Sequence, residues 1–531
     1  MSTQKIMGES EPTELYTLEE PIAESTEIDQ QSPGERAPAD SKPVNLRRWV
    51  GFFVGILAAI GIYFILPDSL AHEGKVTAAI AVLMGVWWMT EALPIPGTAL
   101  VPLVAFPVLS GVDINVVGAS YGNNVIFLFM GGFMLALAME RWNLHRRLAL
   151  HVLKVMGAKT GAMIGGFMIA TGFLSMWVSN TATAVMMLPI GMSVLLLVAK
   201  VVPEMGTQGT NEHGDPVVKS NFASALMLGI AYSASIGSLG TIIGTPPNTL
   251  LVGYMAENFG IQIGFGQWML VGVPLAIVFM FIAWVVLTKV IYRPEIKEVP
   301  GGKQLIQDEL EALGPVSKGE IRVLLTFILA AGAWILIPLI FENPPISDAG
   351  IALVIGLILF VSPAGSARGV RLLDWHSAVQ LPWGVLLLFG GGLALSAQFS
   401  ASGLTEWIGV QASGIGGLPA WVLVAIVAGG ILLLTELTSN TATAATFLPV
   451  AGGIAIGIGA DPMLLAIPVA LAATCAFMLP VATPPNAVAF GSGYVSIGQM
   501  VKGGVWLNLI ALVLVTLTTM TLAVWVFHIV I

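Results

Sequence analysis

The sequence predicts an all-α, polytopic membrane protein with about eleven transmembrane helices and two re-entrant hairpins. Composition, recurring apolar runs and an internal repeat lead to this prediction. Of the 531 residues, 56% are hydrophobic and only 10% are charged, whereas an ordinary soluble domain carries about 25% charged residues. Apolar runs of roughly 20 residues, long enough to cross a bilayer as helices, recur along the chain. Examples are residues 50–66, 268–287 and 507–526.

The N-terminal segment differs from the rest. Residues 1–45 contain ten acidic and three basic side chains and few aromatic ones. We expect a disordered cytoplasmic tail here, and no cleaved signal peptide, because the basic stretch that begins one is missing. The predicted domains that follow are a first transmembrane half (46–292), a cytoplasmic linker (293–320) and a second transmembrane half (321–531).

The predicted membrane elements follow in order along both halves. Two hairpins that enter and return are expected at 160–200 and 419–458, and two composite regions near 219–260 and 463–500. The basic, amphipathic stretch 141–154 is expected to lie in the plane of the interface. Continuous spans are predicted near residues 48–66, 76–92, 96–110, 124–140, 268–291, 321–341, 349–363, 379–397 and 504–528.

Lysine and arginine residues predict the orientation. All of the Lys and Arg residues except Lys75 can lie on one side of the membrane. The loops predicted on the opposite side contain no Lys or Arg; they are 111–123, 255–267, 342–350 and 400–418. Under the positive-inside rule, the basic side is cytoplasmic. We therefore expect a multi-pass protein of the cell membrane with its N-terminus in the cytoplasm and its C-terminus outside.

An internal repeat divides the membrane region. SNTATA occurs at 179–184 and again at 439–444, an offset of 260, and GTPPN at 244–248 recurs as ATPPN at 482–486. Apart from the first span, each half is predicted to hold five spans and one hairpin, and an odd number of spans inverts the second half. Two inverted repeats interrupted by polar residues at membrane depth are typical of secondary transporters. The alternative is a repeat whose polar tips serve only helix packing.

Each SNT triplet lies in the middle of an apolar hairpin, at tips 179–181 and 439–441. Ser, Asn and Thr are favoured helix N-caps, so each tip is predicted to begin a helix whose free N–H groups attract anions. The helix that ends before each triplet leaves carbonyl groups that can bind a cation.

The two TPPN motifs are predicted to break helices. Paired prolines remove backbone donors and disfavour helix before them, so carbonyl groups at Gly244 and Ala482 are expected to be exposed. One tip and one break from each half could form an all-oxygen sodium site. No Lys or Arg lies inside the apolar part of either hairpin or in either break. A carboxylate anion bound there would need sodium and helix N-termini to neutralise it, because an uncompensated buried charge is costly.

Few other groups offer chemistry. Glu436 could tune a cation site or carry a proton, or it could simply hydrogen-bond to neighbouring groups; both readings stay open. Glu91, beside Trp87 and Trp88, is expected to be structural. The six histidines are not spaced as a metal set, and the single Cys475 excludes an intrachain disulfide. The sequence contains no phosphate loop and no nucleophile–base constellation, so an enzyme is not expected.

With these motifs the chain resembles the divalent anion–sodium symporters, specifically the bacterial sodium/dicarboxylate branch, over roughly residues 45–531. The doubled SNT and doubled PPN set is highly specific. The acidic tail and the polar loop 203–220 have no counterpart in the family pattern. The matching stretches are FLFMGGFMLALAMERWNLHRRLAL (127–150), TGFLSMWVSNTATAVMMLPIG (171–191), SIGSLGTIIGTPPN (235–248), LPWGVLLLFGGGLALS (381–396), TELTSNTATAATFLPV (435–450) and CAFMLPVATPPNAVAFGSG (475–493).

The resemblance implies sodium-coupled symport of C4-dicarboxylates (succinate, fumarate, malate) into the cell. It also implies a homodimer in contact with membrane lipid, with no nucleic-acid partner, whose transport domains move against scaffold domains as an elevator. Sodium site 1 would involve Ser175, Ser179, Asn180 and Gly244, and sodium site 2 would involve Thr435, Thr438, Asn440 and Ala482. The substrate would meet Asn180, Thr181, Thr245, Ser439, Asn440, Thr441, Thr483 and Pro484.

Other functions compete with this expectation. Sodium-independent dicarboxylate exchange, sodium-coupled transport of citrate or sulfate, and a passive anion channel are the transport alternatives. Oxygen-rich residues at the cation positions favour symport over exchange. An intramembrane hydrolase could use Ser179 or Ser439 as nucleophile, but neither half offers a His or Lys partner at membrane depth.

Overall fold

The computed structural model describes residues 42–201, 219–341 and 344–530. It divides the chain into residues 1–47 and residues 48–531, and the description below concerns the second unit. The predicted disordered tail (up to residue 41) and the polar loop 203–220 (up to residue 218) lie outside the described residues. Residues 42–45, which were expected in the tail, belong to the first turn of α1 (Lys42–Ile65).

After α1, the described part of the first half continues with eleven further helices, α2 to α12. Its last long helix continues into a π-helical stretch, Val286–Ile291. The helices are α2 (His72–Thr90), α3 (Ile95–Thr98), α4 (Val101–Ser110), α5 (Ile114–Ala119), α6 (Asn124–Arg141), α7 (Leu144–Met156), α8 (Thr160–Ser175), α9 (Asn180–Val201), α10 (Asn221–Ser238), α11 (Pro246–Phe259) and α12 (Phe265–Val285).

The second half is built in the same way, and its last long helix also continues into a π-helical stretch, Thr519–Ala523. The helices are α13 (Gly302–Ala312), α14 (Lys318–Ile340), α15 (Asp348–Val361), α16 (Trp375–Ala378), α17 (Trp383–Ala401), α18 (Leu404–Ala412), α19 (Ala420–Thr435), α20 (Asn440–Gly457), α21 (Pro462–Thr474), α22 (Pro484–Gly491), α23 (Ile497–Thr518) and α24 (Val524–Phe527).

The order of helices repeats between the halves. The series α6 to α12 corresponds one by one to α17 to α23: a long helix, a short helix, two helices around an SNT tip, two around a PPN break, and a long helix that ends in π-helix. The predicted repeat is therefore present in the helix order, and the predicted composite regions are helices interrupted at 239–245 and 475–483.

Seven helices in the described parts of the chain are long and apolar enough to cross a bilayer. Five shorter apolar helices of 10–17 residues accompany them, among them α8, α19 and α21. These three end at a tip or a break, since a helix that stops at membrane depth need not span it. The seven are Lys42–Ile65, Ile114–Arg141, Asn180–Lys200, Phe265–Ile291, Lys318–Ile340, Trp383–Ala401 and Ile497–Phe527.

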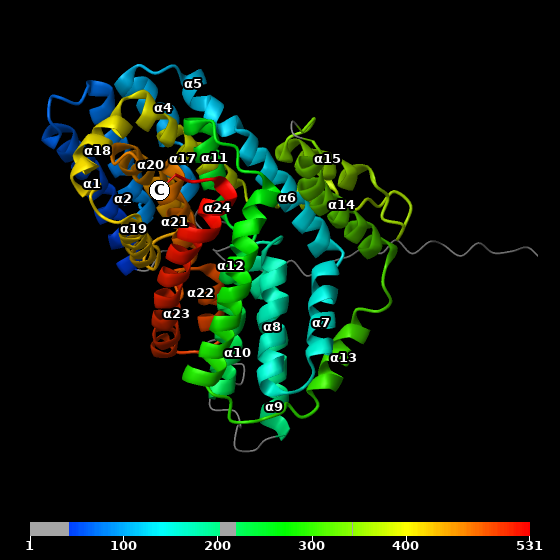
Figure 1. The fold of residues 1–531 in the computed structure, drawn as a ribbon. Helices are drawn as coiled ribbons and strands as arrows, with labels where there is room; N and C mark the ends of the chain where they lie inside the picture. The colour runs from blue at the N-terminus through cyan, green and yellow to red at the C-terminus, as the bar shows by residue number, and fades with distance from the viewer. Residues whose placement is uncertain (1–41, 202–218, 342–343, 531) are drawn as a thin grey trace, which may run out of the picture. The chain divides into compact units, whose positions relative to one another are not determined.

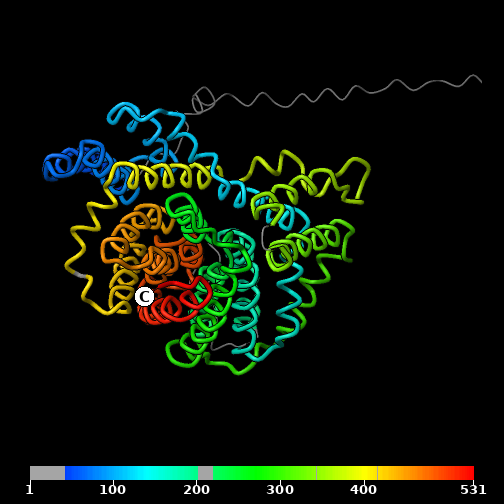
Figure 2. Tube along the Cα trace, turned by 45° about the horizontal axis from the view of Figure 1, so that its top comes forward, coloured from blue at the N-terminus to red at the C-terminus, as the bar shows by residue number. Residues whose placement is uncertain are grey.

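Helices α10 and α21 form the centre of the second unit. Every residue from Phe222 to Ser238 and from Met463 to Thr474 is buried, as expected for helices that are apolar or small all round. Helix α8 packs on α10, and α19 packs on α21. The helices after the breaks cross over: α11 packs on α20 and α21, and α22 packs on α9 and α10. Figure 2 shows these second-half segments, in orange and red, beside the green segments of the first half.

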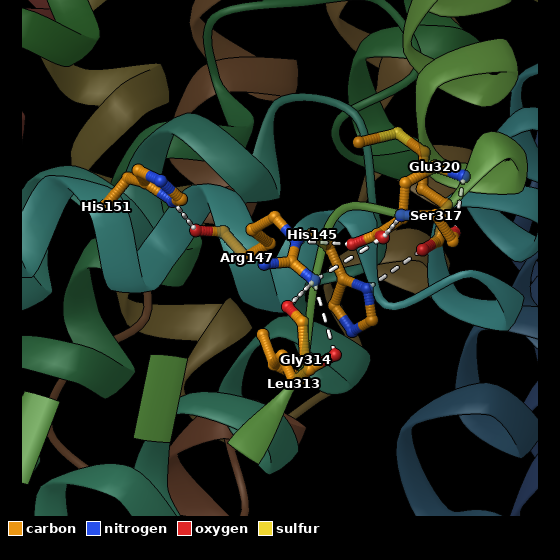
Figure 3. A network of polar contacts seen from close by, with 8 residues as sticks. His145, Arg147, His151, Leu313, Gly314, Ser317 and Glu320 are labelled. Atoms are coloured by element: carbon orange, nitrogen blue, oxygen red, sulfur yellow. Dashed lines mark hydrogen bonds and ion pairs between the residues drawn. The ribbon is translucent and has the colours of Figure 1, made fainter. Parts of the chain in front are cut away.

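A buried ion pair ties α7 to the start of α14 (Figure 3). Arg147 Nε donates to Glu320 Oε1 at 2.5 Å, and Arg147 Nη2 donates to the carbonyl oxygens of Leu313 and Gly314. The two side chains are only 9% and 4% exposed. Glu320 also closes a capping box with Ser317, which begins α14. The predicted interfacial helix is thus anchored to the segment that joins the halves (Figure 1).

We expect Glu320→Ala to lower the free energy of unfolding by about 3–5 kcal/mol, because it leaves the buried Arg147 guanidinium without its counter-charge. Denaturant unfolding of the purified protein in detergent measures this. The control is Glu309→Ala, which breaks the more exposed pair between Arg146 and Glu309 and should cost less than about 1 kcal/mol. Equal effects of the two substitutions would contradict the assigned role of the buried pair.

Candidate functional site

Both SNT triplets begin a helix after a short non-helical stretch. Helix α8 ends at Ser175 and α9 begins at Asn180; α19 ends at Thr435 and α20 begins at Asn440. The Ser179 hydroxyl accepts from the N–H of Ala182 at 3.2 Å, and the carbonyl groups of Ser179 and Ser439 accept from Thr183 and Thr443. The predicted helix N-termini are therefore present at both tips, at equivalent positions in the two halves.

Behind each tip lies a cluster of three oxygen atoms that share one hydrogen. Ser175 Oγ lies 2.6 Å from Asn180 Oδ1 and 2.5 Å from the carbonyl oxygen of Ala234. A hydroxyl has a single hydrogen to donate, so it cannot satisfy both acceptors at once. One of the two acceptors therefore receives no hydrogen from Ser175, and such an oxygen is a suitable ligand for a hard cation.

The second half repeats this cluster. Thr435 Oγ1 lies 2.9 Å from Asn440 Oδ1 and 2.7 Å from the carbonyl oxygen of Ala473. Ser175 and Thr435 are fully buried, whereas Asn180 and Asn440 are half-buried. In each half, one asparagine therefore links a buried oxygen cluster to the more accessible tip.

The first cluster continues toward Gly244. Asn180 Nδ2 donates to Ser238 Oγ at 3.3 Å. Gly244 packs against the backbone of Ser238 so closely that an added Cβ would lie 2.4 Å from the Ser238 carbonyl oxygen. Only glycine fits here. Of the residues predicted for sodium site 1, the structure thus brings Ser175, Asn180 and Gly244 together, with Ser179 at the adjoining tip.

The second predicted set is brought together less completely. The Thr438 hydroxyl donates to the Leu434 carbonyl and contacts Thr443 Oγ1 at 2.6 Å. Its side chain lines a separate, small cavity shared with α2. Thr435 and Asn440 are in contact, but the Thr438 side chain faces elsewhere. Ala482 is buried in the second break.

The predicted substrate residues differ in exposure. Thr181 and Pro484 are exposed, Ser439 is half-buried like Asn180 and Asn440, and Thr441 is 9% exposed. Thr245 and Thr483 are buried N-caps of α11 and α22. Thr245 Oγ1 lies 3.3 Å from Thr474 Oγ1 of the other half, while Thr483 Oγ1 accepts from the N–H of Asn486 at 3.3 Å.

At each PPN break, an asparagine side chain donates hydrogen bonds to two backbone carbonyl groups. Asn248 Nδ2 donates to the carbonyl oxygens of Leu239 and Thr241, and Asn486 Nδ2 donates to those of Ala476 and Leu479. Both side chains are fully buried. Among the described residues, neither Oδ1 receives a hydrogen bond, so each break holds one more unsatisfied acceptor oxygen.

Glu436 accepts hydrogen bonds from the backbone of the second break. The side chain is 2% exposed, and its carboxylate accepts from the backbone N–H groups of Phe477, Met478 and Leu479 at 2.7–3.1 Å. Asn508 Nδ2 of α23 donates to the same carboxylate at 2.7 Å. The structure thus shows the hydrogen-bonding arrangement that was one of the two predicted roles, with four donor groups around the buried carboxylate.

Four residues around the sites were missed by the sequence reasoning: Ser238, Asn248, Asn486 and Asn508. The two PPN asparagines recur at equivalent places in the repeat, so the repeat itself was a signal for them. Ser238 and Asn508 gave no such signal, because their partners lie 58 and 72 residues away in sequence.

Comparisons with known sequences agree with these motifs. Residues 46–529 match the family described as "Sodium:sulfate symporter transmembrane region". The chain is 43% identical over 486 residues to the "Sodium-dependent dicarboxylate transporter SdcS" of Staphylococcus saprophyticus, across 90% of this chain and 92% of that protein. It is 42% identical over 482 residues to the protein of the same name from Staphylococcus aureus, across 90% and 91%.

Two solved structures share the fold. The YdaH transporter of Alcanivorax borkumensis aligns with a TM-score of 0.52 at 14% identity, over 86% of this chain and 98% of that one. MtrF of Neisseria gonorrhoeae, described as illuminating a class of antimetabolite efflux pumps, aligns with a TM-score of 0.50 at 13% identity, over 88% and 97%. At such identities the likeness concerns the fold alone.

We expect Asn248→Ala and Asn486→Ala each to lower the free energy of unfolding by about 1–3 kcal/mol, because each removes two hydrogen bonds to buried carbonyl groups. The Leu239 and Leu479 carbonyls keep a second donor, Trp268 Nε1 and the Ala482 N–H. Within the described residues, those of Thr241 and Ala476 keep none. Denaturant unfolding in detergent measures the loss. Asn115→Ala, which removes an exposed amide that contacts only Asp113, is the control and should change stability by no more than about 0.5 kcal/mol. Unchanged stability in both Asn248→Ala and Asn486→Ala would show that water replaces the amides.

Proposed function

We propose, since the chain belongs to the sodium:sulfate symporter family, that it carries C4-dicarboxylates such as succinate, fumarate and malate into the cell together with sodium ions. It is a multi-pass membrane transporter and not an enzyme. Relatives named sodium-dependent dicarboxylate transporters match it over nearly their whole length, which supports both Na⁺ as the coupling ion and dicarboxylates as the substrate class.

The observation that carries this proposal is the pair of equivalent oxygen clusters, each with three oxygens and one hydrogen. Hydroxyl, amide and carbonyl oxygens are ligands suited to a hard cation. Each cluster adjoins a helix N-terminus that attracts a carboxylate. A dicarboxylate would place one carboxylate at each tip, and each tip would have one cation site beside it.

We assign sodium site 1 to Ser175, Ser179, Asn180 and Gly244, with the Ser238 hydroxyl as a neighbour. Sodium site 2 takes Thr435, Thr438, Asn440 and Ala482. Thr438 would contribute its backbone carbonyl, because its hydroxyl faces the cavity shared with α2. The substrate would contact Asn180, Thr181, Ser439, Asn440 and Thr441, while Thr245, Thr483 and Pro484 would border the pocket.

The same proposal extends to the architecture. The halves 46–292 and 321–531 would be inverted repeats joined by the linker 293–320, with eleven spans, two re-entrant hairpins (160–200 and 419–458), a cytoplasmic N-terminus and an extracytoplasmic C-terminus. The repeated helix order and the crosswise packing of α11 and α22 support this. Each protomer of a lipid-embedded homodimer would move its transport domain as an elevator.

Uptake of labelled succinate into proteoliposomes tests the function. With an inward sodium gradient, at fixed pH and zero voltage, we expect accumulation above the external concentration, and none with potassium in place of sodium. Uptake that requires internal succinate but not sodium would identify an exchanger. Equilibration without accumulation would identify a passive channel, and competition by citrate or sulfate reports substrate choice.

Asn180→Ala and Asn440→Ala should each reduce sodium-driven uptake by about 10- to 100-fold, because each removes a hydrogen bond to a charged ligand worth roughly 1.5–3 kcal/mol. The matched control is Ser193→Ala on α9, whose exposed hydroxyl donates only to the Pro189 carbonyl; it should transport normally. If both asparagine variants transport as the unmodified protein does, the site assignment is wrong.

A further inference from the structure

An apolar groove lies between α8 and α12, which run side by side in Figure 1. Its volume is about 650 Å³, within the range of roughly 300–1,000 Å³ typical of small-molecule pockets. Small residues of α8, namely Gly161, Ala162, Gly165 and Gly172, hollow one wall. The groove is separate from the oxygen clusters described above.

Both walls also expose large apolar side chains. Ile277 and Phe281 of α12 are 61% and 63% exposed, and Ile169 and Phe173 of α8 are 48% and 43% exposed. Since α12 is apolar enough to span a bilayer, this surface meets acyl chains rather than water. The groove is therefore open to lipid along its length.

One end of the groove carries a positive charge. Trp284 Nε1 donates to the Gly161 carbonyl at 2.8 Å and so fixes the indole at that end. Lys289 Nζ lies 5.8 Å from the Trp284 ring centroid, and a Cβ added at Gly161 would lie 3.8 Å from Nζ. Lys289 is exposed, and within the described ranges no carboxylate pairs with it.

An apolar groove with a lysine at one end matches an amphiphile with an anionic head. From Gly161 to Phe173, α8 is about 18 Å long at about 1.5 Å per residue, close to the roughly 15 Å of one leaflet's hydrocarbon. Lys289 also lies on the side that the positive-inside rule marks as cytoplasmic, where anionic lipids concentrate.

We propose that this groove binds an acyl chain of an anionic phospholipid whose phosphate contacts Lys289. Met176 and Trp177 also line the groove, and only Val178 separates them from the tip residues Ser179 and Asn180. A bound acyl chain therefore packs against the back of the first tip.

Fluorescence quenching by lipids with brominated acyl chains tests this in the full-length protein in nanodiscs. The difference between the protein and its Trp284→Phe variant isolates the emission of Trp284. Brominated phosphatidylglycerol should quench this emission about fivefold more effectively than brominated phosphatidylcholine at equal mole fraction, the effect of one lysine at a membrane surface.

Lys289→Gln should remove the preference for phosphatidylglycerol, and Lys289→Arg should restore it, which separates charge from folding. The matched control is Lys200→Gln, since Lys200 is an exposed lysine in the last turn of α9 that does not line the groove. Ala162→Phe should weaken quenching by both lipids.

Equal quenching by the two headgroups in the unmodified protein would overturn the proposal. No quenching of Trp284 would also overturn it, and would indicate that a second protein copy covers the groove.

Discussion

The centre of this protein depends on satisfying peptide groups where helices stop inside an apolar interior. In hydrocarbon each unpaired N–H or C=O costs several kcal/mol, so non-helical backbone persists only where something else binds it. Here buried side chains do so: Asn248 and Asn486 bind carbonyl groups, and Glu436 binds N–H groups. The oxygen clusters lie next to these breaks, at the ends of α10 and α21.

The two halves meet this constraint in different ways. At the position of Glu436, 260 residues earlier, the first half has Met176, and there the Thr241 hydroxyl donates to the Met176 backbone carbonyl. The two halves thus share equivalent oxygen clusters, but the hydrogen bonds beside those clusters differ between the halves. Since the Glu436 carboxylate accepts hydrogen bonds from four donor groups, it stabilises the second break.

The sequence predicted the parts of the site that follow from local chain chemistry. Ser-Asn-Thr caps and paired prolines act within a few residues, so the tips and breaks were predictable. The grouping of Ser175 with Asn180 came from the family resemblance alone. The partners supplied by tertiary packing were not predictable. Ser238 and Asn508 reach the site from other helices, and Thr438 sits in the motif although its hydroxyl turns toward α2. Spacing along a chain does not determine which face of a helix meets which neighbour.

Sodium coupling follows from the charge balance of this arrangement under the proposed function. A dicarboxylate brings two negative charges to tips where the sequence offers no basic side chain, and helix N-termini supply only partial charges. In that function, the clusters, which have more acceptor oxygens than hydrogens, would hold cations more tightly when an anion is near. Coupling between two ligands is reciprocal, so sodium that strengthens dicarboxylate binding is itself held more tightly by the dicarboxylate. Under the proposed function, sodium ions therefore supply the positive charge that a basic residue would otherwise provide at the tips.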